Sequence, residues 1–285
     1  MEKVPVRQHG HAKRKLPVTI LAAYMMLGLL SVIMIFPFVW MLLSSLKDAT
    51  QIFKLRFLPE APTLDNYRYI LSNTSKFPQW FQNSVIVALC TTASVLFFDS
   101  LVGYALSKFS FPGKKLIFLL IVSTLMIPTE MLVIPWYAMA RAMKWVNTYW
   151  GIMFPGMISA FGVFLMRQFM QTLPDDLIDA ARVDGMGEMR IFLTIVLPLV
   201  RPALATLAIF NFIGNWNAFL WPLIAASKPK MFTLPVGLAN FSGEAGSDWH
   251  YIMTGAAVAM APLILVFLLF QKQIVRGIAM TGLKG

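Results

Sequence analysis

The sequence predicts an all-α membrane protein with six transmembrane helices. Of its 285 residues, 58% are hydrophobic and only 13% are charged. An ordinary soluble domain carries about a quarter charged residues, so this chain has too few charges to cover a surface that faces water. The mean hydropathy is +0.69, and the apolar residues are gathered in long runs. The composition therefore excludes an ordinary cytosolic enzyme and a disordered or collagen-like chain.

Six runs are long enough for a helix to cross the bilayer core, which takes about 20 mainly apolar residues. They contain no Asp, Glu, Lys or Arg apart from Asp99 in the second run and Glu130 in the third. The runs are 16–46, 77–107, 116–140, 145–166, 202–227 and 249–271. The first run is much longer than the apolar core of a signal peptide, and no cleavage site follows it. The predicted helices lie at about 17–46, 83–107, 116–140, 148–170, 201–226 and 250–272.

An even number of spans places both termini on the same side of the membrane. That side carries fifteen Lys and Arg residues and the other side nine, so the rule that basic loops stay inside puts the termini in the cytoplasm. The expected organisation is a cytoplasmic arm, a six-helix domain with a cytoplasmic loop and an outer loop, and a cytoplasmic tail. The arm is 1–15 and the tail is 276–285. The six-helix domain is 16–275, and it includes the cytoplasmic loop 174–198 and the outer loop 228–250.

The cytoplasmic loop 174–198 is predicted to form a short helical hairpin. Pro174 followed by two aspartates is a typical helix start, and Gly185 after Asp184 is a typical helix end. The apolar residues Leu177, Ala180, Ala181 and Ile191 are expected to need a partner surface. The alternative is an amphipathic hairpin on the lipid surface, which the loop's five acids disfavour because they repel anionic lipid.

The run Asp179 to Gly185 (D-A-A-R-V-D-G) followed by Ile195-Val196-Leu197-Pro198 resembles the EAA loop of ABC importer permeases. Asp179 stands where that family usually has Glu. The segments 215–223, 234–238 and 271–285 are similar to the carbohydrate-uptake branch, in particular to the smaller six-helix permease of maltose-type importers. The resemblance implies a type I importer bundle with a cytoplasmic coupling helix, in a bacterial or archaeal cytoplasmic membrane.

In that family the EAA helix sits in a cleft of the ATPase subunit, and the resemblance assigns the coupling role to one group of residues here. These are Asp179, Ala180, Ala181, Asp184, Gly185, Met186 and Glu188. The outer loop of relatives can reach the docked binding protein, which implies contacts from Asn240, Phe241, Ser242 and Gly243; a plain surface hairpin is the alternative. The tail of relatives can insert between the ATPases, with simple solvation as the alternative.

A substrate path is predicted beside the fifth helix. Amides in the membrane are costly unless they face protein or water, and amides beside aromatic rings suit a sugar. The candidates are Asn211, Asn215, Trp216 and Asn217, with Glu130 in the third helix. The alternative is that the asparagines bond neighbouring helices. Asp99 and Glu130 are expected to be structural or cavity-facing acids rather than a proton relay.

The chain has no G-x-x-x-x-G-K-[ST] phosphate loop, one cysteine and three scattered histidines. We therefore expect no enzyme activity, no metal site and no bound cofactor, with ATP and magnesium held by partner ATPases. The expected partners are a larger permease, two ATPase subunits, an external binding protein, lipid and a carbohydrate, and no nucleic acid. The alternatives are an ABC importer permease for a phosphorylated polyol or another non-sugar solute, and a secondary transporter or channel.

Overall fold

The computed structural model describes residues 18–54, 56–241 and 248–282. Within these ranges every regular element is a helix and no strand occurs, which confirms the all-α prediction. Three helices are long and apolar enough to cross a membrane: α1 (Val18–Ser44), α3 (Phe77–Lys108) and α14 (Trp249–Gly282). Three further pairs of shorter helices pass the same test when each bent pair is taken as one span, giving up to six spans.

The bent pairs are helices that are interrupted by a break of a few residues. The first pair joins α4 (Lys114–Ser123) and η1 (Thr124–Met126) to η2 (Thr129–Leu132) and α5 (Val133–Ala142), and is bent by 96°. The bend falls at Ile127 and Pro128, both in extended backbone. A proline cannot continue the helical hydrogen bonds of the turn before it, so the break occurs where the sequence places Pro128.

The second pair is bent by 46°; it joins α6 (Tyr149–Met153) and η3 (Phe154–Gly156) to α7 (Ala160–Gln171). The third joins α9 (Glu188–Ile191), the π-helical turn η4 (Phe192–Val196) and α10 (Leu197–Leu199) to α11 (Arg201–Trp216), and is bent by 84°. Short connecting helices complete the described chain: α2 (Asp65–Ile70), α8 (Asp175–Val183), α12 (Leu220–Ala225), η5 (Pro229–Met231) and α13 (Leu234–Asn240).

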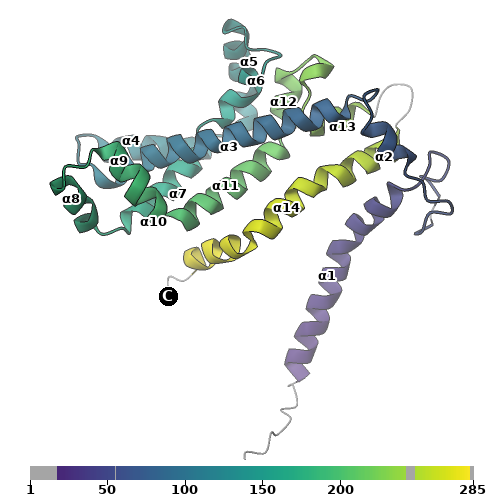
Figure 1. Cartoon of the computed structure of the whole chain (residues 1–285), viewed down its shortest axis with the longest axis horizontal. Helices are drawn as coiled ribbons and strands as arrows, with labels where there is room; N and C mark the ends of the chain where they lie inside the picture. The colour runs from purple at the N-terminus through teal and green to yellow at the C-terminus, as the bar shows by residue number, and fades with distance from the viewer. Residues whose placement is uncertain (1–17, 55, 242–247, 283–285) are drawn as a thin grey trace, which may run out of the picture.

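Helix α3 lies at the centre of the bundle, packed against α7 on one side and α11 on another (Figure 1). Helix α1 diverges from the rest, and the most apolar stretch of its span Ala22–Ser44 has no residue buried inside the chain. Its end is held where Thr254 on α14 donates a hydrogen bond to the Ser45 carbonyl, at 3.1 Å. The bundle proper is therefore built around α3, and α1 leaves most of its apolar surface exposed while it contacts α14.

Two glycines allow α3 and α7 to approach closely. A Cβ on Gly103 would lie 2.9 Å from the Arg167 backbone nitrogen, and a Cβ on Gly162 would overlap the Asp99 carboxylate. Asp99 is fully buried and accepts the Ser159 backbone N–H through both oxygens at 3.1 Å. The intramembrane acid predicted to be structural therefore holds the first turn of α7 against α3.

Replacing Gly162 by alanine is expected to destabilise this contact by about 1–3 kcal/mol, because the added methyl group overpacks the Asp99 site. Gly214 on α11 is the matched control, since a Cβ there meets nothing within 4 Å and alanine favours a helix. We expect a lower thermal unfolding midpoint for G162A, and an unchanged or higher one for G214A, followed by tryptophan fluorescence in detergent. Equal midpoints for the two variants would show that the α3–α7 contact is looser than described.

Candidate functional site

The hairpin predicted between residues 174 and 198 is present at the C-terminal end of α3 (Figure 1). Helix α8 starts after Pro174 with two acids in its first turn. It ends at Gly185, whose φ of +79° is a left-handed conformation that suits glycine. The Gly185 N–H donates to the Arg182 carbonyl and the Met186 N–H to the Ala181 carbonyl, both at 3.0 Å. This is a Schellman helix end, and it fixes the turn into α9.

The hairpin has one face packed on the bundle and one face open. Ile178, Ala181 and Ile191 are buried in a cluster that includes Tyr104 of α3 and Met170 of α7. The expectation that Ala181 and Ile191 need an external partner is therefore wrong, because both pack against this chain's own helices. Leu177, at 48% exposed, Val183, at 87% exposed, and Ala180 remain on the open face.

A set of polar contacts that we call the α3 clamp joins the hairpin to α3; its members are Tyr104, Lys108, Asp175, Asp179, Arg182 and Glu188. The Arg182 guanidinium donates to Glu188 Oε1 at 2.7 Å and to Asp179 Oδ1 at 2.8 Å. The Tyr104 hydroxyl donates to Glu188 Oε2 at 2.7 Å. Arg182 therefore ties the two hairpin helices together, and Tyr104 ties them to α3.

The second contact of the α3 clamp is at the start of α8. Lys108 Nζ donates to Asp175 Oδ1 and to the Leu173 carbonyl, both at 2.6 Å. This hydrogen bond holds the pKa of the Asp175 carboxyl below its usual range, and the bond to Glu188 raises the pKa of the Arg182 guanidinium. Both groups are therefore charged at neutral pH, and the clamp is ionic.

The predicted coupling residues divide between these two faces. Asp179, Ala180, Asp184 and Gly185 are exposed, whereas Ala181 is buried and Met186 is packed against the buried cluster. Glu188 is half-buried and belongs to the α3 clamp. Sequence reasoning missed Tyr104 and Lys108, because nothing in α3 marks them as neighbours of a loop about 70 residues later. The contact between Asp179 and Arg182 could be predicted from their spacing, since residues three apart share a helix face.

The hairpin leads directly into α11, which carries three of the candidate substrate-path residues, Asn211, Asn215 and Trp216. Asn211 Oδ1 accepts a bond from Thr92 on α3 at 3.2 Å and from Asn215 Nδ2 at 3.0 Å. Both asparagines line a cavity of about 180 Å³ between α7 and α11. Its walls come from Ser159, Phe161, Leu207, Phe210, Asn211, Gly214 and Asn215, none of which is charged. Asn211 thus bonds across helices, Asn215 bonds to Asn211 within α11, and both border an open space.

The other candidate path residues lie elsewhere. Trp216 is buried, stacks on Phe212 and donates from Nε1 to the Ala259 carbonyl of α14 at 3.2 Å. Asn217 is exposed at the end of α11, and Glu130 is exposed in η2. None of the three lines the cavity that contains Asn211 and Asn215.

In the outer loop, Asn240 is exposed at the end of α13, and Phe241 packs edge-on against Trp80 of α3 with ring centroids 5.4 Å apart. Ser242 and Gly243 lie outside the described residues. Across the described part of the chain, no cluster of three or more His, Cys, Asp or Glu side chains could hold a metal ion.

Three comparisons place this architecture among known proteins. Residues 99–280 match the family described as "Binding-protein-dependent transport system inner membrane component". The arabinooligosaccharides transport system permease protein AraQ of Bacillus subtilis is 36% identical over 261 residues, 90% of this chain and 93% of the relative. The trehalose/maltose transport system permease protein MalG of Thermococcus litoralis is 33% identical over 261 residues, 90% of this chain and 94% of the relative.

A third relative is named for a different kind of solute. The sn-glycerol-3-phosphate transport system permease protein UgpE of Pectobacterium atrosepticum is 38% identical over 209 residues, 73% of this chain and 74% of the relative. Among solved structures, a bacterial ABC transporter involved in the import of the acidic polysaccharide alginate has a chain that matches with a TM-score of 0.79 at 22% identity. The match covers 94% of this chain and 99% of that one, and it shows a shared fold.

Proposed function

Since the chain belongs to the family of binding-protein-dependent transport system inner membrane components, we propose that it is the permease subunit of an ATP-binding cassette importer for a carbohydrate. It is a multi-pass membrane protein, as its helices and family indicate. The observation that carries the proposal is the two-faced hairpin. Its inner face is bonded to α3, and its outer face leaves Leu177, Ala180 and Val183 open to a partner.

The partner on the open face is an ATPase subunit. The chain has no phosphate loop of its own, so ATP and magnesium are held by two separate ATPases and the chain itself is not an enzyme. Closure of the ATPases on ATP pushes on the hairpin, and the α3 clamp passes the displacement to α3 while the continuous backbone passes it to α11. The bundle then alternates between an inward-open and an outward-open arrangement.

A second, larger permease completes the path. Helix α1 leaves most of its apolar surface exposed in this chain, and lipid together with a second permease covers it. The external binding protein docks on the outer side, near Asn240 and Phe241. This orientation keeps both termini and the hairpin in the cytoplasm, as the count of basic residues favours.

Carbohydrate is the cargo that the cavity chemistry supports. Relatives named for arabinooligosaccharides and for trehalose and maltose match most of this chain. The cavity beside Asn211 and Asn215 offers amide groups and a phenyl ring without a charged residue. Amides with an aromatic surface bind sugar hydroxyls and C–H faces. A phosphorylated polyol, the cargo named for the UgpE relative, calls for a cation to bind its phosphate, and none lines this cavity.

The function is tested by reconstituting the chain with its larger permease, the two ATPases and the external binding protein in proteoliposomes. Labelled arabinooligosaccharide, malto-oligosaccharide and glycerol 3-phosphate are offered outside, with ATP inside. We expect saturable uptake of one oligosaccharide that requires both ATP and the binding protein. Uptake that persists without ATP would identify a secondary transporter, and uptake of glycerol 3-phosphate alone would identify the second candidate.

Replacing Asn215 by leucine is expected to reduce sugar uptake by about tenfold, which corresponds to the loss of about one hydrogen bond to the passing substrate. ATP hydrolysis stimulated by the loaded binding protein should stay within about twofold, because the hairpin is untouched. Q168L is the matched amide control, since Gln168 is exposed on α7 and does not line the cavity. Equal uptake by N215L and Q168L would remove Asn215 from the path.

A further inference from the structure

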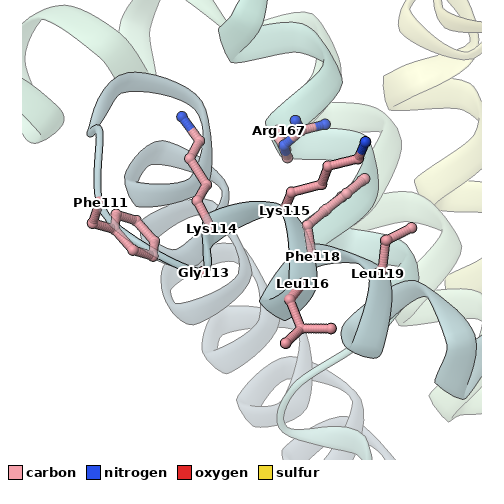
Figure 2. Close-up of a pocket in the computed structure, with 8 residues that line it drawn as sticks. All are labelled: Phe111, Gly113, Lys114, Lys115, Leu116, Phe118, Leu119 and Arg167. Atoms are coloured by element: carbon pink, nitrogen blue, oxygen red, sulfur yellow. The ribbon is translucent and has the colours of Figure 1, made fainter.

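A second cavity, of about 910 Å³, lies where α4 begins beside α7 and has no role in the proposed path (Figure 2). Its lining residues are Phe111, Gly113, Lys114, Lys115, Leu116, Phe118, Leu119 and Arg167. The cavity is on the hairpin side of the bundle, because the nearby Lys108 at the end of α3 is bonded to Leu173 and Asp175. It therefore lies at the boundary between the membrane and the compartment that contains the hairpin.

The cavity gathers positive charge that no described carboxylate neutralises. Arg167 donates from Nε to the Leu106 carbonyl at 3.2 Å, and its guanidinium lies 3.9 Å from the centroid of the Phe118 ring. The Lys115 side chain extends toward Arg167 in Figure 2. Neither forms an ion pair within the described ranges. Two like charges on the wall of one cavity repel each other, and an anion between them relieves that repulsion.

The third cation of the cavity has a structural role. Lys114 Nζ donates to the Phe109 carbonyl at 2.7 Å and to the Ser107 carbonyl at 3.2 Å, so its ammonium group caps the end of α3. In Figure 2 it points away from Lys115 and Arg167. The anion site is therefore formed by Lys115 and Arg167.

The rest of the cavity wall is apolar. Leu116 and Leu119 are 61% and 53% exposed, and the same helix continues with the exposed Ile117 and Leu120. This surface belongs to the bent candidate span that begins at Lys114, so hydrocarbon can lie along it. A cationic pair above an apolar helix face matches a molecule that has an anionic head and an acyl tail.

We propose that this cavity binds an anionic phospholipid of the leaflet on the hairpin side. Lys115 and Arg167 bind the phosphodiester, and the acyl chains lie along Leu116, Leu119 and Leu120. A free phosphate would satisfy the two cations but would leave the exposed leucines without an apolar partner, so the observations favour the lipid. Placing that leaflet on the cytoplasmic side rests on the orientation given under Proposed function; the lipid site itself does not.

The test uses the full chain purified with its partner subunits in a neutral detergent. Native mass spectrometry measures the binding of added phosphatidylglycerol and of added phosphatidylcholine. The variants are K115Q, R167Q and the double variant, and K228Q/K230Q is the control because both lysines are exposed in the loop on the opposite side. K115Q is the decisive single variant, since no hydrogen bond or ion pair of the Lys115 side chain is present in the structure and its loss leaves the fold intact.

For phosphatidylglycerol we expect the dissociation constant to rise about fivefold in K115Q and more than about tenfold in the double variant. These values follow from a binding free energy of about 1 kcal/mol contributed by each cation. The control should stay within about twofold, and phosphatidylcholine should bind at least about tenfold more weakly than phosphatidylglycerol. An unchanged K115Q, or equal binding of the two lipids, would overturn the proposal. Displacement of the lipid by inorganic phosphate at equal concentration would also overturn it, because the site would then bind a free anion.

Discussion

Replacing Gly185 by valine should lower sugar uptake by about tenfold or more while the protein remains inserted in the membrane. Gly185 has a φ of +79°, where a β-branched residue is strained by about 1–3 kcal/mol. That strain acts on the turn between α8 and α9, and a shift of 1.4 kcal/mol changes an equilibrium tenfold. A Cβ at Gly185 meets nothing within 4 Å, so the new side chain also projects from the open face on which we propose that the ATPase docks.

Gly187 provides the control for this prediction, because it resembles Gly185 in exposure but differs from it in the φ angle. It is two residues away, a Cβ there also meets nothing within 4 Å, and its φ is −71°, which any residue adopts. Uptake into proteoliposomes, with the amount of inserted chain measured in parallel, should be within about twofold of the parent for G187V. If the two valine variants transported sugar equally, the left-handed turn would have no part in coupling.

Replacing Arg182 by alanine should uncouple ATP hydrolysis from transport. The variant removes the ion pair to Glu188, which joins α8 to α9, and the ion pair to Asp179 within α8. These pairs are partly exposed, so each is worth only about 0–1 kcal/mol in stability and the fold persists. The hairpin can still dock through Leu177 and Val183. We therefore expect hydrolysis within about twofold of the parent and uptake reduced about tenfold, because the route from α8 through Glu188 and Tyr104 to α3 is broken.

The measurement is the number of ATP molecules hydrolysed per sugar imported, which a purely structural role would leave constant. Exchanging the charges, as R182E/E188R, should restore part of the coupling, since the ion pair can form in reverse. R190A is the control, because Arg190 is exposed on the same hairpin and has no ion pair in the described chain. An unchanged ratio in R182A would mean that α11 alone carries the coupling.

The sequence was sufficient for the membrane class and for the hairpin, and each has a physical reason. Long charge-free runs are not expected in a soluble protein of this size. In the loop 174–198, the acids indicate a helix start, the alanines allow a close contact, and Gly185 indicates a turn. Ile191 shows where this reasoning fails, because an apolar residue on a loop indicates burial but not the surface that buries it. The α3 clamp is a contact between distant segments, and no local pattern encodes it.

The substrate path shows a similar limit. Asn215 and Trp216 are adjacent in the sequence, but successive residues of a helix point about 100° apart. One therefore borders the cavity while the other packs on α14. The bend at Pro128 was foreseeable as an irregularity, but the proline alone does not determine its 96° angle; α5 beyond the bend also packs against α12.

The 84° bend between α10 and α11 makes α11 a lever with its fulcrum at Val200. Asn211 lies eleven residues beyond that fulcrum, a distance of about 16 Å at 1.5 Å per residue. A rotation of the hairpin arm by about 10° would therefore displace the Asn211 amide by about 3 Å, the length of one hydrogen bond. A rotation of that size in the hairpin arm would be enough to break the bond between Asn211 and Thr92.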